Sequence, residues 1–178
     1  DGILVVAAAG NSSWPVTVSS DSTNWNNSIV FSGSTRKTWQ GMSPGAADDV
    51  ICVGSFGSKG TTGKEYISRF SNHGKRIDIW APGSDIMSAG KSGTYSDPRN
   101  SIYRLYSESG TSMASPQVCG TLACLLEQEP RLSQSDCVAY LEQHCKSDQL
   151  TDSGGSTSDT TSLQGSSNRY LFYFKQRP

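Results

Sequence analysis

Residues 110–118 read Gly110-Thr111-Ser112-Met113-Ala114-Ser115-Pro116-Gln117-Val118 and are the most informative stretch of the chain. Apolar residues continue almost all round this segment to Leu126, which predicts a buried helix beginning at Thr111. Pro116 is compatible with that helix because it falls in the first turn. Ser112 would lie where free backbone N–H groups and the helix dipole favour developing negative charge. Spacing alone does not separate this role from that of a serine that merely caps the helix.

On either side of this segment, predicted strands alternate with predicted helices. The predicted strands are residues 3–9, 49–56, 77–80 and 170–174, the first of them buried on both faces. Ser133-Gln134-Ser135-Asp136 predicts a capping box that begins a second helix, with Cys137, Tyr140, Leu141 and Cys145 on one stripe. Residues 84–110 show no regular pattern. Alternating strands and helices indicate the α/β class, and because a domain rarely opens on a central strand, we expect residues before Asp1 to belong to this fold.

Composition narrows the possible functions. The chain has 178 residues with 15 Lys or Arg and 16 Asp or Glu, a net charge of -1. This near balance argues against partners such as nucleic acid or a membrane surface, and the longest apolar run, Ile3–Ala9, is too short for a membrane helix. Five cysteines favour an oxidising compartment, with at least one left unpaired within the chain. Two histidines are too few for a zinc site of the usual spacing.

The glycine-rich segment Gly57–Glu65 superficially suggests a phosphate-binding loop. Its last Gly-Lys pair, Gly63-Lys64, is followed by Glu65, where that motif requires a Ser or Thr that binds a metal ion. The spacing between the glycines also differs by one residue from that of the phosphate-loop motif. We therefore interpret the segment as a surface turn and reject nucleotide binding.

Three motifs in order resemble the subtilisin-like serine proteases, the subtilases. Residues 110–118 resemble their nucleophile motif, Ala7-Ala8-Ala9-Gly10-Asn11 resembles their oxyanion-hole strand, and 70–74 followed by 78–83 resemble the segment between. The resemblance implies a subtilisin-like parallel sheet with flanking helices, of which residues 1–178 form the C-terminal portion of the catalytic domain. Residues 12–43 would be an insertion loop and 151–167 a polar loop. Ser112 would be the nucleophile, Asn11 an oxyanion donor, and Ala8, Ala9 and Gly10 a wall of the substrate pocket.

The same resemblance shows what the chain lacks. In subtilases the triad Asp and His motifs precede the oxyanion Asn, and this sequence starts just before Asn11. We expect an N-terminal segment or a partner chain to supply both residues. His73 and His144 are the alternative bases within the chain, but we interpret both as structural histidines.

Further expectations follow from the proteinase K branch of the family, which the chain most resembles. Cys52 falls only in part on that branch's Val-Cys-x-Val-Gly strand motif, and the resemblance implies a Cys52–Cys137 disulfide. It also implies a structural calcium ion bound by Asp78 with the carbonyls of Asp49 and Ile51, oxygen donors that suit Ca²⁺. The alternative is that Asp78 simply caps a turn. Cys119 and Cys124 are expected as small apolar fillers in the buried helix.

The function expected is that of a secreted serine endopeptidase acting on peptide or protein substrates, inactive as this chain alone. One alternative is a protease-derived pseudoenzyme that serves as a scaffold or interaction module. A lipase or esterase fits less well, because Gly110-Thr111-Ser112-Met113-Ala114 lacks the second glycine of Gly-x-Ser-x-Gly. Of the glycosylation sequons at Asn11 and Asn26, only the second is expected to be used, because a glycan on Asn11 would block its amide.

Overall fold

The computed structural model describes residues 3–59, 65–90, 95–151 and 162–172. Its main sheet has the strand order β10-β12-β6-β4-β5-β11, with β1 paired to β4. The strands are β1 Val6–Ala8, β4 Ile51–Lys59, β5 Glu65–Ile67, β6 Ile79–Pro82, β10 Lys146–Ser147, β11 Leu150–Thr151 and β12 Arg169–Tyr170. Parallel pairs join β4 to β1 and β6, β6 to β12, and β5 to β11, whereas β4–β5 and β10–β12 are antiparallel. The predicted α/β class is confirmed, with a mixed sheet.

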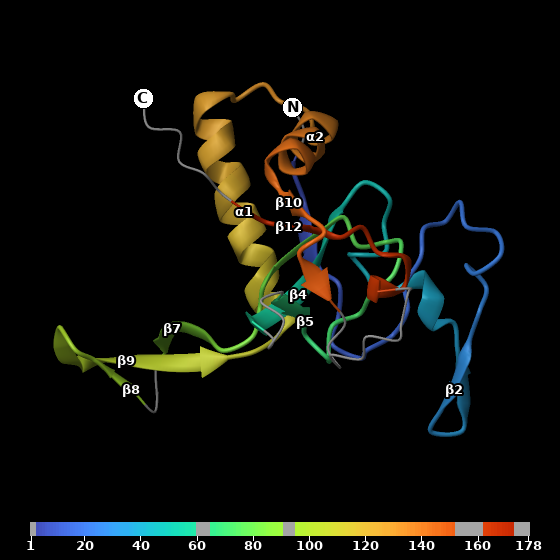
Figure 1. Ribbon diagram of the computed structural model, residues 1–178, viewed down its shortest axis with the longest axis horizontal. Coiled ribbons are helices and arrows are strands. Elements are labelled where there is room, and N and C mark those ends of the chain that lie inside the picture. The colour runs from blue at the N-terminus through green and yellow to red at the C-terminus, as the bar shows by residue number, and fades with distance from the viewer. Residues whose placement is uncertain (1–2, 60–64, 91–94, 152–161, 173–178) are drawn as a thin grey trace.

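Two helices pack on one face of this sheet: α1 Thr111–Gln128 and α2 Gln134–His144 (Figure 1). The capping box predicted at the start of α2 is present, with Ser133 and Asp136 bonded reciprocally. The core under the helices contains Ile51, Val53, Ile79, Ala81, Ala114, Val118, Leu122, Leu125, Cys137 and Leu141. The opposite face has its own core of Ala9, Val16, Cys52, Phe56, Ile67, Ile77, Trp80, Leu150 and Leu163. Successive strand residues therefore serve opposite cores, as the pleat requires.

That alternation corrects the predicted Cys52–Cys137 disulfide, because both thiols are free. Cys52 faces the core of Trp80, whereas Cys137 lies in the helix-side core with Val53. The resembled motif has one residue between its Cys and Val-Gly, whereas Cys52 directly precedes Val53. A shift of one residue turns a strand side chain to the other face of the sheet. Burial also raises the pKa of the Cys52 thiol to about 12, which keeps the buried thiol neutral.

Two expectations of complete burial are also wrong. Strand β1 is shorter than residues 3–9, only its central Ala7 is buried, and Ile3 is 89% exposed. Helix α1 buries one side only, so Cys119 and Cys124 are exposed rather than apolar fillers of the core. Residues 170–174 contribute only the end of β12, and residues 173–174 lie outside the described part of the chain.

Residues 84–110, expected to be irregular, form a separate three-stranded antiparallel sheet in the order β7-β9-β8. Its strands are β7 Ile86–Gly90, β8 Tyr95–Asp97 and β9 Asn100–Glu108. This sheet projects from the body of the molecule (Figure 1), and Ile102 on it is 81% exposed. Both faces meet solvent, so the sequence lacks the apolar–polar alternation that would have revealed the strands.

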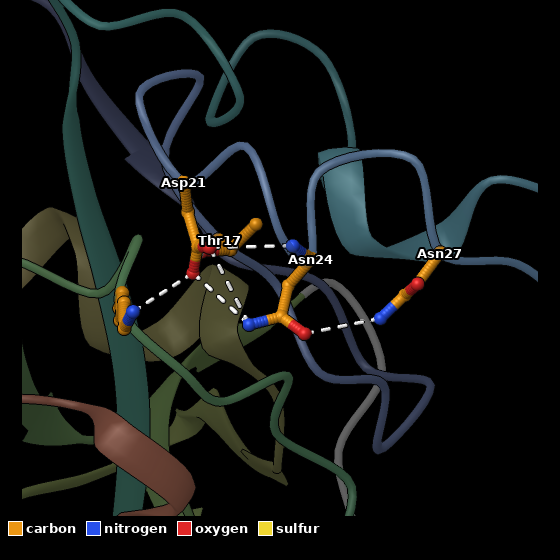
Figure 2. Close-up of polar contacts among 5 residues, drawn as sticks. Thr17, Asp21, Asn24 and Asn27 are labelled. Carbon is orange, nitrogen blue, oxygen red and sulfur yellow. Dashed lines mark hydrogen bonds and ion pairs between the residues drawn. The ribbon is translucent and has the colours of Figure 1, made fainter.

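The 12–43 segment contains a hairpin, β2 Ile29–Phe31 and β3 Ser34–Arg36, followed by the 3₁₀ helix η1 Thr38–Gln40. Asp21 anchors it: its carboxylate accepts hydrogen bonds from Thr17 and Asn24 (Figure 2) and forms an ion pair with Lys75. These contacts, that of Lys75 above all, hold the pKa of Asp21 well below its ordinary value.

The expected polar loop 151–167 is described only at Thr151 and from residue 162, where η2 spans Ser162–Gly165. Residues 60–64 of the rejected phosphate loop also lie outside the description. In the part of the chain described, no helix is long and apolar enough to cross a bilayer.

Candidate active site

Helix α1 presents Ser112 to solvent on its first turn. Gly110 is the N-cap residue, and no side chain caps the helix, so the alternative in which Ser112 is only a cap is wrong. The N–H of Gly110 donates to the carbonyl of Gly83 (2.7 Å), which fixes the entry to the helix. The first-turn N–H groups have no partner within the helix and carry its positive partial charge. The nucleophile candidate therefore lies where an anion is favoured.

Asn11 lies beside Ser112, although the two residues are 101 positions apart in the sequence. Its Oδ1 accepts from the backbone N–H of Thr111 (2.9 Å) and from Thr111 Oγ1 (2.8 Å). A backbone N–H can only donate, so the atom facing it must be the amide oxygen. The Nδ2 group is thereby directed elsewhere, and it lies 3.2 Å from where a Cβ on Gly110 would stand. The structure thus brings the two predicted residues together at the start of α1, with the Asn11 amide near Gly110.

Asn72 is a residue that sequence reasoning missed. It is 0% exposed, and its Nδ2 donates to Ala9 O (2.8 Å) while its backbone N–H donates to Gly10 O (2.9 Å). Its Oδ1 accepts from the N–H groups of Ser12 (3.1 Å) and Trp14 (3.0 Å). One buried side chain therefore holds the backbone on both sides of Asn11. The motif at 70–74 contained this residue, but a polar residue in a loop gives no periodic signal of burial.

Gly10 is required by this arrangement. Its φ is +103°, and a Cβ there would stand 2.6 Å from Asn72 Nδ2 and 2.9 Å from the sulfur of Met42. Its N–H donates to Thr111 Oγ1 (3.2 Å), the hydroxyl that also contacts Asn11. Thr111 is fully buried, so this hydroxyl is a second positioning group that the sequence did not reveal.

The predicted pocket wall, Ala8, Ala9 and Gly10, follows the end of β1. Ala9 is buried and its N–H donates to Val53 O (3.0 Å), which continues the pairing of β1 with β4 beyond Ala8. Of the three residues, Ala8 and Gly10 are half-buried, and Gly10 directly precedes Asn11.

Neither histidine forms a hydrogen bond with Ser112 among the described residues. Among the described residues, no hydrogen bond involves the Ser112 hydroxyl. His73 is buried, with Nδ1 3.4 Å from Ser71 O, and its Nε2 has no partner in the described part of the chain. His144 is the last residue of α2, and its ring stacks on that of Tyr140 with the ring centroids 4.1 Å apart. Among the described residues, the candidate nucleophile Ser112 and the Asn11 amide therefore lie close together without a histidine bonded to Ser112.

The predicted calcium ligands Asp78, Asp49 and Ile51 belong to two segments that meet where Cys52 bonds to Asp78. Ile51 directs its backbone polar groups towards β1, because its N–H donates to Val5 O (2.9 Å). Cys52 directs its own towards Asp78, whose Oδ2 accepts from the Cys52 N–H (2.8 Å). Carbonyls of successive strand residues point to opposite edges, so the Ile51 carbonyl faces away from Asp78. Asp49, whose carbonyl was the other predicted ligand, precedes β4 and is exposed.

Known proteins are similar to this chain in sequence. A model described as the Subtilase family matches residues 1–168. The chain belongs to the subtilase family. It is 32% identical over 128 residues to alkaline serine exoprotease A of Vibrio alginolyticus, covering 72% of this chain and 21% of that protein. It is 33% identical over 145 residues to an alkaline proteinase of Hapsidospora chrysogena, covering 82% of this chain and 30% of that protein.

Solved structures give the same fold. The crystal structure of a cold adapted subtilisin-like serine proteinase matches with a TM-score of 0.60 and 25% identity, covering 94% of this chain and 44% of that chain. The psychrophilic protease S41 matches with a TM-score of 0.59 and 26% identity, covering 94% and 48%. The subtilisin-like fold expected from the sequence motifs is confirmed. This subtilase chain spans less than half the length of these relatives.

Proposed function

We propose that this chain contributes the nucleophile and the oxyanion hole of a subtilisin-like serine endopeptidase. Ser112 Oγ would attack a peptide carbonyl, and the Ser112 N–H together with Asn11 Nδ2 would stabilise the oxyanion that forms. The observation that carries the proposal is the double contact of Asn11 Oδ1 with Thr111, because it fixes the amide next to Ser112. Preorganised donors of this kind stabilise charge only as it develops.

The general base would come from another segment, either preceding residues or a partner chain, together with the triad Asp. A serine hydroxyl is a poor nucleophile at neutral pH unless an adjacent base accepts its proton. Two surfaces suit such a segment. Within the described residues β1 pairs only with β4, so its other edge is open, and the outer side of α1 exposes Cys119, Ala123 and Cys124. A strand and a helix from the completing segment would cover both.

The substrate would be a peptide or protein chain, with Ala8, Ala9 and Gly10 lining the pocket for the side chain that precedes the cut. The carbonyl of Ala9 is engaged by Asn72 and that of Gly10 by the Asn72 backbone N–H. The wall is thus held in place before substrate binds, which reduces the entropic cost of binding.

A fluorophosphonate probe, which labels only activated serines, tests the proposal. We expect no labelling of purified 1–178 and strong labelling of Ser112 when the Asp- and His-bearing segment is present. Ser112→Ala should abolish labelling, whereas Ser115→Ala on the same helix should preserve it. In the completed protein Asn11→Ala should lower kcat by about 10²–10³, the loss measured for one such donor in subtilisin. Labelling of the chain alone would show that His73 or His144 serves as base. No labelling with the segment present would favour the scaffold function.

Secretion is also part of this proposal. Asn26 belongs to an exposed sequon, and its side chain contacts only Lys37 (3.1 Å) among the described residues. Treatment of native material with an N-glycosidase should therefore lower its mass by one glycan, with Asn26→Gln as the control. An unglycosylated Asn26 in protein from its own organism would contradict that expectation.

A further inference from the structure

Arg76 is a buried cation that the motifs did not identify. The residue is 3% exposed and lies between the segment that leads into β4 and the start of β6. Its Nη1 donates to Asp78 Oδ2 (2.8 Å). Its Nη2 donates to the carbonyl of Ala47 (2.6 Å) and to that of Val50. The guanidinium thus faces one carboxylate oxygen and two main-chain carbonyls.

The direction of the strand carbonyls explains why these oxygens converge. Cys52 presents its backbone polar groups to Asp78, whereas Ile51 does not, and the carbonyl of Val50 accepts from Arg76 instead. Asp78 exchanges two bonds with Cys52, accepting from its N–H (2.8 Å) and donating its own N–H to Cys52 O (3.0 Å). A carboxylate and two carbonyls on this side form an oxygen set of the kind that hard cations prefer. Arg76 already occupies that set.

We propose that the Arg76 guanidinium is the built-in cation of the Asp78 site and replaces the calcium ion that the sequence motifs predicted there. The guanidinium neutralises Asp78 and joins the loop at Ala47 to the start of β6, as a bound ion would. A divalent ion at Asp78 would have to displace a positive group from its carbonyl acceptors, and repulsion opposes both being present. The inference concerns stability and does not depend on the proposed peptidase activity.

The proposal predicts that the stability contributed at this site does not depend on the calcium concentration. A metal ion stabilises a fold only to the extent that its concentration exceeds its dissociation constant. A guanidinium attached to the chain contributes at any calcium concentration. The native protein should therefore melt at the same temperature in EDTA and in calcium, as far as this site is concerned.

Calorimetric calcium titration and thermal unfolding of the full chain test the proposal. The native protein and Asp78→Asn should bind the same number of calcium equivalents, so that any other site cancels. Arg76→Ala should lower Tm by about 6 °C or more, because Asp78 Oδ2 and the carbonyls of Ala47 and Val50 lose their donor. Millimolar calcium should raise the Tm of Arg76→Ala but not that of Arg76→Ala/Asp78→Asn. Arg99→Ala, which breaks the more exposed pair with Asp97, is the matched control and should show no calcium response.

One result overturns the proposal outright: a calcium equivalent bound by the native protein and lost in Asp78→Asn. Failure of calcium to raise the Tm of Arg76→Ala would also contradict it, because the vacated oxygens should then accept an ion. If Arg76→Ala does not fold, Arg76→Lys replaces it: that variant keeps a cation and should remain indifferent to calcium.

Discussion

Two regions of the molecule differ in the contacts that hold them together. One is the projecting β7–β9–β8 sheet, and the other is the corner formed by Asn11, Asn72 and Thr111. At the corner, buried side chains bond directly to the backbone, with Asn72 and Thr111 both 0% exposed. In the projecting sheet the backbone ladders run over β7 and β9, yet Met87, Tyr95, Ile102 and Tyr103 remain exposed. Backbone pairing defines a strand but leaves its side chains free to vary. Around Asn11, by contrast, the polar atoms of the buried side chains are committed to hydrogen bonds that fix the neighbouring backbone.

This contrast predicts different sensitivity to substitution. A buried polar group left without its partner loses its hydrogen bonds to both water and protein. An exposed group loses nothing that water cannot replace. Substitutions at the corner should therefore be costly, and equivalent ones in the projecting sheet nearly silent.

The largest effect is expected for Asn72→Ala. The substitution leaves Ser12 N–H, Trp14 N–H and Ala9 O without their partner, and each such loss costs about 1–3 kcal/mol. We expect the free energy of unfolding, measured by urea titration, to fall by about 3–5 kcal/mol.

Asn100→Ala is the matched control from the projecting sheet. Asn100 Oδ1 also accepts from a backbone N–H, that of Ile102 (3.0 Å), but at an exposed position. Water can replace that contact, so the change should stay within about 0.5 kcal/mol. Equal losses for the two asparagines would remove the distinction between the regions.

Thr111→Val should have a smaller, more specific effect. It removes the hydroxyl that donates to Asn11 and accepts from Gly10, while the Thr111 N–H still holds Asn11. Stability should fall by about 1–2 kcal/mol because the Gly10 N–H loses its acceptor.

In the protein completed with its Asp and His, Thr111→Val should lower kcat about tenfold while KM changes little, since a loosened donor acts mainly in the transition state. Thr111→Ser keeps the hydroxyl and should retain kcat. A change confined to KM would mean that Thr111 shapes the substrate pocket instead of positioning Asn11.

Structural features that depend only on residues adjacent in the sequence could be predicted from it. The start of α1 at Thr111 and the Ser133–Asp136 capping box depend on neighbouring residues only, and both match the structure. The three motifs likewise predicted a site at Asn11 and Ser112, and the fold places Asn11 against the neighbouring Thr111. Features that depend on tertiary contacts were not predictable in this way. No periodic pattern in the sequence predicts the burial of Asn72 or the contact of Arg76 with two carbonyls.

The errors have a common physical origin in strand parity and exposure. Cys52 was assigned to the wrong face because a one-residue difference in the motif reverses every side chain of a strand. The same parity removes the Ile51 carbonyl from Asp78. The β7–β9–β8 strands were missed because neither face is buried, so Asn100–Glu108 shows no alternation despite its β-branched and aromatic residues.

The smallest effect is expected for Ile102→Ser in β9. Ile102 is 81% exposed, so replacing its side chain removes almost no buried apolar surface. The free energy of unfolding should change by less than about 0.5 kcal/mol in the same urea titration. Ile79→Val provides the comparison, because Ile79 is 2% exposed and loss of one methylene there should cost about 0.5–1.5 kcal/mol. A minor deletion in the core would then exceed a complete side-chain replacement in the projecting sheet. If Ile102→Ser instead proved the costlier of the two, the projecting sheet would have to bury Ile102 in solution, and its description as an exposed region would be wrong.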